Sequence, residues 1–363
     1  MKRHKSGNRG SVWILLVCVG GLAASARAVP QGYNITQVNY GVALSINSQG
    51  DIGGVTGGSP QRAWVWSSGQ VTTIPTLGGS NSGDTYVNDL GQVVGCSNKV
   101  GSGQYGAYLW ENSSLRDLGL PDGAREARAM SINNSGQIVG WGRMLAGNDY
   151  AFIWKDGQFT NIGALPGQTY ARAFDINSSG QVVGYSARDE THGSNAFIWQ
   201  NGAMAPLGSL YGSDPSSAAA INDLGQVVGW SFAGVEYRCA FMWQNGAMTN
   251  LGKLPGYSSA YAEGINNLGQ AVGRCFPSYG DMGDPHACLF QDGVVYDLND
   301  FLEPDSGWTL QGAYDINDSG KIVGYGRYNG VNYYGFLLTP VPEPATMCLL
   351  AVGSLAMLCR KRR

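Results

Sequence analysis

Aromatic side chains at one recurring position are the residues of this sequence best suited to hold a ligand. Each follows a Val-Gly step: they are Trp141, Tyr185, Trp230 and Tyr325. Cys96 and Arg274 occupy the same position in two other places. Aromatic faces stack on sugar rings and on a partner's aromatic side chains. Two interpretations stay open, a ligand-stacking ring on one face of the fold and simple packing.

Cysteines are few between the two ends of the chain, namely Cys96, Cys239, Cys275 and Cys288. This number is too small for a disulfide scaffold. Because no Cys-x-x-Cys is present, the sequence predicts no zinc site. Cys275 and Cys288 are placed to pair across one hairpin, so they form the candidate disulfide.

Two segments, beginning at Asp175 and Asp315, read Asp-x-Asn-x-Ser-Gly and imitate the start of a calcium loop. A helical calcium loop needs Glu at its twelfth position, where this chain has Ser186 and Gly326. We therefore interpret both segments as hairpin turns and predict no metal there. Asp281 and Asp284 lie in a longer insertion, and a cation held by them is the remaining metal hypothesis.

Signals for catalysis are absent from the sequence. There is no Gly-x-Ser-x-Gly elbow, and outside the N-terminal region the histidines are His192 and His286. The sequence predicts no catalytic residue, no cofactor and no enzyme. Carboxylates brought together from distant segments would change this conclusion, so a glycan-active enzyme stays as an alternative.

The elements that position these residues come from one repeated unit. An Asn-x-x-Gly turn recurs seven times, at Asn47, Asn88, Asn133, Asn177, Asn222, Asn266 and Asn317, with spacings of 41, 45, 44, 45, 44 and 51 residues. Asn bonds the backbone two residues on and Gly accepts positive φ, so each turn joins two strands. An Ala-aromatic-x-Trp segment supplies a third strand and a Leu-Gly segment a fourth. Its tryptophans, Trp66, Trp110, Trp154, Trp199 and Trp243, are expected between neighbouring units.

Four short strands in about 44 residues match one propeller blade. The seventh unit has three strands, over 313–338, before the chain changes character, and 33–38 occupies the phase of a fourth strand. We therefore predict an all-β, seven-bladed β-propeller of four-stranded blades over residues 29–340. Its first and last segments would share one blade, which removes exposed sheet edges. An open β-solenoid is the alternative.

The net charge of −3 averages unlike parts. Removing five basic residues from positions 1–28 and four from the last four positions leaves 14 basic against 26 acidic residues, a net −12. An acidic body disfavours nucleic acid as a partner. Residues 1–28 have a basic start, an apolar core and the small residues Ala26 and Ala28, which predicts a signal peptide cleaved after Ala28. A transmembrane anchor is the alternative.

The last segment, 341–363, contains Pro342-Glu343-Pro344, an apolar run over 345–359 and the basic tail Arg360, Lys361, Arg362 and Arg363. As a helix the apolar run would span about 22 Å, which is short for a bilayer of about 30 Å. The basic tail would stay cytoplasmic. A plain tail anchor is the alternative interpretation.

Both the tail and the repeat resemble known families. The tail resembles the PEP-CTERM sorting signal, which implies recognition by an exosortase, cleavage near Pro342 to Pro344, and passage from a membrane-tethered precursor to the cell surface or exterior. The repeat resembles the bacterial extracellular HAF repeat, although the His of that motif is present only at His286. The resemblance implies an exported, non-enzymatic surface or matrix protein, served by secretion machinery and associated with exopolysaccharide or other surface proteins. A lectin-like carbohydrate-binding propeller is the second hypothesis.

Overall fold

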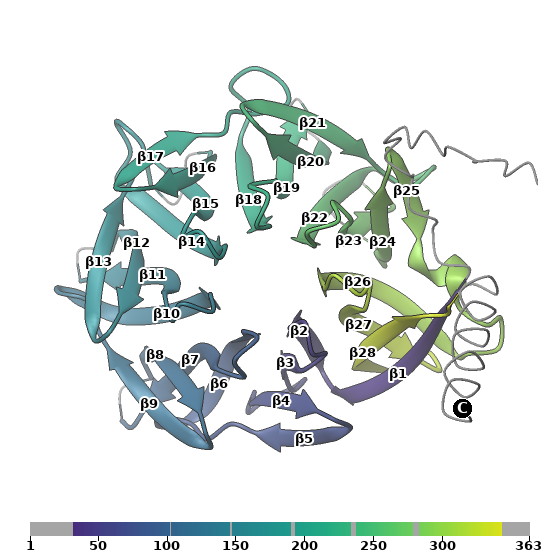
Figure 1. Ribbon diagram of the computed structural model, residues 1–363, viewed down its shortest axis with the longest axis horizontal. Coiled ribbons are helices and arrows are strands. Elements are labelled where there is room, and N and C mark those ends of the chain that lie inside the picture. Colours follow the sequence, from purple (N-terminus) through teal and green to yellow (C-terminus); the bar gives the residue numbers. More distant parts are fainter. Residues whose placement is uncertain are drawn as a thin grey trace, which may run out of the picture.

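Each copy of the repeat forms a four-stranded antiparallel sheet, and seven sheets stand around one axis (Figure 1). The computed structural model describes residues 32–342 except 102, 146, 190–192, 234–236 and 279–282. Within this part the expected seven-bladed, four-stranded propeller is confirmed.

The blades follow the sequence in order. Blade 1 contains β2 (Val42–Ile46), β3 (Ile52–Val55), β4 (Ala63–Ser67) and β5 (Gln70–Thr73). Blade 2 contains β6 (Gly78–Val87), β7 (Val93–Lys99), β8 (Tyr105–Glu111) and β9 (Ser114–Gly119). Blade 3 contains β10 (Ala124–Ile132), β11 (Ile138–Met144), β12 (Asp149–Lys155) and β13 (Gln158–Gly163). Blade 4 contains β14 (Tyr170–Ile176), β15 (Val182–Ala187), β16 (Asn195–Gln200) and β17 (Ala203–Pro206).

The remaining blades follow the same plan. Blade 5 contains β18 (Ser216–Ile221), β19 (Val227–Ala233), β20 (Tyr237–Gln244) and β21 (Ala247–Gly252). Blade 6 contains β22 (Ser259–Ile265), β23 (Ala271–Phe276), β24 (His286–Gln291) and β25 (Val294–Asp297). The 3-10 helix η2 (Leu298–Phe301) lies in the longest repeat spacing and leads to blade 7, with β26 (Trp308–Ile316), β27 (Ile322–Tyr328) and β28 (Asn332–Pro340). In every blade the strand that precedes the Asn-x-x-Gly turn lies innermost (Figure 1).

Blade 7 joins the two ends of the chain. Its sheet has the order β1-β28-β27-β26, in which β1 (Tyr33–Tyr40) is the outermost strand. Figure 1 shows β1, in purple, against the yellow C-terminal strands. Tyr33 pairs with Pro340 at one end of the contact and Tyr40 with Tyr334 at the other. The expected N-terminal fourth strand is therefore confirmed.

A glycine and an aromatic residue occupy the same two facing positions in nearly every blade. Gly229 on β19 pairs with Phe241 on β20, and a bulge in β18 falls between Ala218 and Ala220. A Cβ on Gly229 would lie 2.1 Å from the carbonyl oxygen of Ser217, so only glycine fits beside the bulge. The aromatic column is at most 1% exposed: it is Trp64, Tyr108, Phe152, Phe197, Phe241 and Phe336, with Cys288 in its place in blade 6. The packing of these residues explains the Val-Gly and Ala-aromatic signals of the repeat.

The tryptophans expected between units also pack on the core, but less deeply than this column. Trp154 is 4% exposed within its cluster. The others are partly buried against their clusters: they are Trp66, Trp110, Trp199 and Trp243.

Candidate functional site

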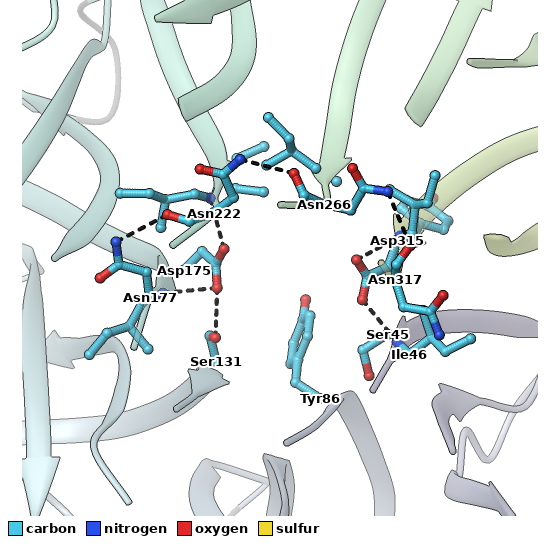
Figure 2. A pocket seen from close by; sticks show the side chains of 18 of the residues that line it. Ser45, Ile46, Tyr86, Ser131, Asp175, Asn177, Asn222, Asn266, Asp315 and Asn317 are labelled. Carbon is cyan, nitrogen blue, oxygen red and sulfur yellow. Dashed lines mark hydrogen bonds between the residues drawn. The ribbon is translucent and has the colours of Figure 1, made fainter. Parts of the chain in front are cut away.

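The innermost strands of all seven blades surround a central cavity of about 580 Å³. Its lining comes from β2, β6, β10, β14, β18, β22 and β26, from the turns that follow them, and from Trp230 of β19 and Arg274 of β23. Figure 2 shows polar side chains from several blades pointing into it. The propeller therefore brings together residues that are far apart in the sequence.

A continuous ring of turn asparagines, the asparagine ring, surrounds the cavity. Its seven members are Asn47, Asn88, Asn133, Asn177, Asn222, Asn266 and Asn317. Each side-chain amide donates to the main-chain oxygen of the asparagine in the next blade, over 2.9 to 3.2 Å. Figure 2 shows two of these links, from Asn177 to Asn222 and from Asn222 to Asn266. The circle has no gap, because the amide of Asn317 returns to Asn47.

The other atoms of each ring asparagine hold its own turn. Asn222 Oδ1 accepts from the backbone N–H groups of Leu224 and Gln226, and Nδ2 also donates to Gln226 Oε1. Each ring asparagine is 3 to 7% exposed. One side chain thus shapes a hairpin and ties two blades together. The sequence interpretation identified the hairpin and missed the inter-blade bond.

Two aspartates, each two residues before a ring asparagine, join further pairs of blades. Asp175 Oδ2 accepts from the backbone N–H of Ile221, and Oδ1 accepts from the hydroxyl of Ser131. Asp315 Oδ2 accepts from the backbone N–H of Ile46 across the closure of the ring. Figure 2 shows Asp175 beside Ser131 and Asp315 beside Ile46. These are the residues of the two calcium-like segments, and their oxygens serve hairpin and blade contacts.

Burial shifts the proton affinity of these carboxylates. Removal from bulk water raises the pKa of Asp175 to about 6, although the hydrogen bonds from Ile221, Ser131 and Ile176 act in the opposite direction. The same desolvation raises the pKa of Asp315 to about 7, against hydrogen bonds from Ile46 and Ile316. Both groups therefore titrate near neutral pH.

A second set of side chains, the arginine–aromatic layer, lies on the first three strands of the blades, and its members Trp230, Tyr261, Arg274 and Tyr314 line the cavity. The layer is formed by Arg128, Trp141, Arg172, Trp230, Arg238, Tyr261, Arg274 and Tyr314. Arg172 of blade 4 lies 4.1 Å from the ring centroid of Trp141 in blade 3. Arg274 of blade 6 lies 5.6 Å from the ring centroids of Tyr261 and Tyr314. Guanidinium groups at these distances are attracted to aromatic faces.

Carboxylates pair with the arginines of this layer. Asp84 accepts from Arg128 at 3.1 Å, and Glu263 lies 3.0 Å from Arg274. Asp149 is completely buried and accepts from Arg143 Nε, Arg172 Nε and the hydroxyl of Tyr170. Burial alone would raise the pKa of Asp149, but these hydrogen bonds outweigh it and hold the pKa below its usual range.

The four aromatic residues expected to stack on a ligand have different surroundings. Trp230 lines the cavity, with Tyr261 edge-on at 6.2 Å and Arg238 at 5.1 Å. Trp141 is 7% exposed and is contacted by arginines. Tyr185 stacks on Tyr170, and Tyr325 stacks on Tyr314. The ring of ligand-stacking residues thus stays a hypothesis, with Trp230 as its member at the cavity.

Other candidate residues lie away from the cavity. The thiol of Cys288 donates to Cys275 Sγ at 2.8 Å, and both residues are free cysteines. His286 Nδ1 lies 2.6 Å from Asp297 Oδ2. Asp284 pairs with Arg327 and accepts from Gln311. Asp281 and His192 fall outside the described residues.

Among the described residues no group of three or more His, Cys, Asp or Glu side chains could hold a metal ion. Nor does that part of the chain include a helix long and apolar enough to cross a membrane. The expected hydrophobic helix at 345–359 and the cleavage residues Ala26 and Ala28 lie outside the described residues. So do Glu343, Pro344 and the tail Arg360, Lys361, Arg362 and Arg363.

Sequence comparison decides the nature of the C-terminal segment. Residues 340–363 match the PEP-CTERM protein-sorting motif. The chain carries a PEP-CTERM signal. It is accordingly an exported protein sorted by an exosortase system through a membrane-anchored precursor. The PEP-CTERM match begins one residue before the expected boundary and overlaps the last residue of β28.

Solved structures share the fold of this chain at low identity. The β-propeller domain of the Trilobed protease from Pyrococcus furiosus has a TM-score of 0.53 and 13% identity, over 72% of this chain and 82% of that one. One of two prolyl endopeptidases has a TM-score of 0.55 and 9% identity, over 86% of this chain and 51% of that one. A puromycin-hydrolyzing peptidase from Mycobacterium tuberculosis has a TM-score of 0.52 and 10% identity, over 83% and 53%.

These similarities show the propeller fold alone. The chain spans about half the length of the prolyl endopeptidase and of the puromycin-hydrolyzing peptidase. The Trilobed protease domain is described as having an open Velcro topology, whereas β1 and β28 pair here. No curated protein matches the sequence.

Proposed function

We propose that this protein is a non-enzymatic propeller displayed at the cell surface or in the extracellular matrix, where it has a structural or adhesive role beside exopolysaccharide. The observation that supports the role is the use of the polar groups at the cavity. The asparagine ring, Asp175 and Asp315 form hydrogen bonds to neighbouring blades. Such groups stabilise a scaffold, and a general acid or base would need a free approach to substrate.

We also infer that the repeated unit is a HAF-type repeat. The support is the Ala-aromatic pair on the third strand, as in Ala196-Phe197 and Ala240-Phe241, whose members are completely buried. Burial assigns this pair to packing. The His that precedes it in the family motif is replaced by Asn195 and Cys239 in these two copies, which agrees with a structural role for the repeat.

The sorting part of the proposal is tested by replacing Pro342-Glu343-Pro344 with Gly-Ser-Gly in the full-length chain and fractionating the cells. We expect the variant to stay with the inner membrane and the parent chain to reach the surface. The same replacement at the exposed segment Glu303-Pro304-Asp305 is the matched control and should leave sorting unchanged. A variant at 342–344 that still reaches the surface contradicts the proposal.

The absence of catalysis is tested with the purified exported protein and a panel of glycoside, ester and peptide substrates. We expect no turnover above that of buffer. Turnover that disappears in a variant at Asp175 or Asp315 would instead establish an enzyme in the cavity. This test is independent of the sorting test.

A carbohydrate-binding function is the second candidate, supported by the arginine–aromatic layer. Arg128, Arg172 and Arg274 have side chains that are 27, 23 and 26% exposed, so each keeps part of its surface open. Aromatic rings beside cationic donors suit a glycan with acidic groups. If the protein binds carbohydrate, we expect acidic glycans on a glycan array to bind it. We expect Trp230→Ala to weaken this binding at least tenfold. Tyr211→Ala, at a residue 51% exposed outside the cavity lining, should change nothing.

A further inference from the structure

Two departures from the repeat coincide in blade 6. The completely buried column that is aromatic in the other six blades has Cys288 in blade 6. Two residues after the glycine of the second strand, the chain has Ser97, Ser186 or Ser231 in three blades and Cys275 in blade 6. An aromatic residue and a small residue are thus both replaced by cysteine in the same blade.

The two cysteines meet inside the blade. Cys288 pairs with Gly273, and Cys275, two residues further along the same strand, pairs with His286. Residues that pair directly across two antiparallel strands share a face of the sheet, so Cys288 lies on the same face as Gly273. Cys275, two residues after Gly273 on its strand, lies on that face too, and both thiols therefore share it. Gly273 has no side chain there, which leaves space for the sulfurs to approach. Their separation is 2.8 Å, and both residues are 0% exposed.

We propose that Cys275 and Cys288 form a disulfide in the exported protein, and that this bond replaces the missing aromatic side chain as the centre of blade 6. A disulfide has a sulfur separation of about 2.05 Å, so the bond needs a further approach of about 0.75 Å. The exported compartment suits this chemistry, since disulfides persist outside the cytoplasm.

The oxidant is a protein or low-molecular-weight disulfide of that compartment. One cysteine thiolate attacks the carrier disulfide, forms a mixed disulfide and releases one carrier thiolate. The second cysteine thiolate then attacks the mixed disulfide, closes the Cys275–Cys288 bond and releases the other carrier sulfur as a thiolate. The protein loses two protons and two electrons, and the carrier disulfide becomes two thiols.

The bond must form while blade 6 is still open. Burial raises the pKa of the Cys288 thiol well above its ordinary value, and the thiolate is the attacking species. Once the blade has packed, exchange becomes slow. The disulfide is therefore acquired during folding after export.

The test uses the processed protein recovered from the exported fraction, whose cysteines are Cys96, Cys239, Cys275 and Cys288. The protein is denatured without reductant, alkylated with iodoacetamide and digested for mass mapping. We expect a linked peptide pair that contains Cys275 and Cys288 and is 2 Da lighter than the two thiol peptides. Cys96 and Cys239 serve as internal controls and should be alkylated. Alkylation of all four cysteines before reduction overturns the proposal.

A second measurement guards against a bond formed only during handling. Reductant should lower the melting temperature of the parent protein by about 4 °C, because a bond closing a loop of this size stabilises through the unfolded state. Cys275→Ser combined with Cys288→Phe restores the pair found in blades 4 and 5, and its melting temperature should not respond to reductant. Cys96→Ser is the matched single-cysteine control and should respond as the parent does. An unresponsive parent protein contradicts a structural disulfide.

Discussion

The side-chain amide of Asn317 donates to the main-chain oxygen of Asn47 at 2.9 Å, across 270 positions of sequence. This bond links blade 7 to blade 1 and completes the asparagine ring. The circle of seven blades is also closed in a second place, because β1, near the start of the chain, pairs with β28, near its end. Buried bonds of this kind are costly to leave unmade, so the asparagine ring yields the first stability prediction.

Replacing a ring asparagine should destabilise the whole propeller. Asn222→Ala removes the donor to the main-chain oxygen of Asn266, which keeps only its bond from the N–H of Gly269. It also removes the acceptor for two turn N–H groups. We expect a loss of about 2–4 kcal/mol in the free energy of unfolding, measured by urea denaturation. Asn245→Gly is the control, since Asn245 lies in an exposed turn with φ of 51°. Equal losses at both positions would show that the ring adds nothing.

Stability should fall as the pH rises from about 4 to 8. The pKa values of Asp175 and Asp315 are about 6 and about 7 in the folded protein, against 3.8 for an ordinary Asp. The folded state therefore holds more protons than the unfolded state in this window, and the free energy of unfolding decreases with pH. The pKa of His286 is raised by its bond to Asp297, and stability from that bond is also lost as the pH rises. The urea midpoint at pH 4.5 and 8 measures the change.

The aspartate contribution can be separated from that of the histidine. Asp175→Asn combined with Asp315→Asn should flatten the dependence and leave the slope from His286. His286→Gln should leave the slope from the two aspartates in place. A double variant with the parent's full slope would remove these carboxylates from the explanation.

Adding a methyl group beside the inner-strand bulge should prevent normal packing. A Cβ on Gly95 would lie 1.8 Å from the carbonyl oxygen of Asp84, and backbone has to move to admit it. We expect Gly95→Ala to cost about 3 kcal/mol or more, or to abolish folding, as read by thermal melting. Gly83→Ala is the neighbouring control, because its nearest contact is 3.4 Å away at the end of the Gln61 side chain. Its melting temperature should stay close to that of the parent.

Neutralising Asp149 should break the contact between blades 3 and 4. Asp149→Asn leaves Arg143 and Arg172 without their buried anion. Loss of one partner of a buried pair costs about 3–5 kcal/mol, which urea denaturation at pH 7 would measure. Asp117→Asn breaks the exposed pair with Lys99, where Asp117 is 41% exposed, and should cost less than about 1 kcal/mol. Similar losses for the two variants would contradict the buried role of Asp149.

The spacing of the repeat and the residue types of its turns predicted the blades, because a hairpin is a local structure. Asn-x-x-Gly, the glycine after Val and the aromatic third strand all act within one unit. The fourth strand of the last blade was predictable for a related reason, since a unit with three strands leaves an edge that β1 can fill. The sorting segment was readable because its signal is carried by a contiguous stretch of sequence.

Contacts between units were much harder to predict. The bond from Asn222 to Asn266 joins residues 44 positions apart, and Arg172 reaches the ring of Trp141 in the preceding blade. Neither relation has a local signature. One signal was available: the turn asparagine is kept in all seven copies although the residue after it varies. A turn alone tolerates Asp or Gly at that position, so strict retention indicates that both ends of the amide are used.

The way the chain ends has a mechanical consequence. β28 leads directly toward the sorting signal, and β28 lies between β1 and β27. The N–H of Val341 also donates to the oxygen of Gly32. A pull applied to the sorting segment along the axis of β28 would load the hydrogen bonds to both β1 and β27 in shear. The same pull on a strand at the edge of the sheet would load one such row, so the position of β28 doubles the number of bonds that carry the force.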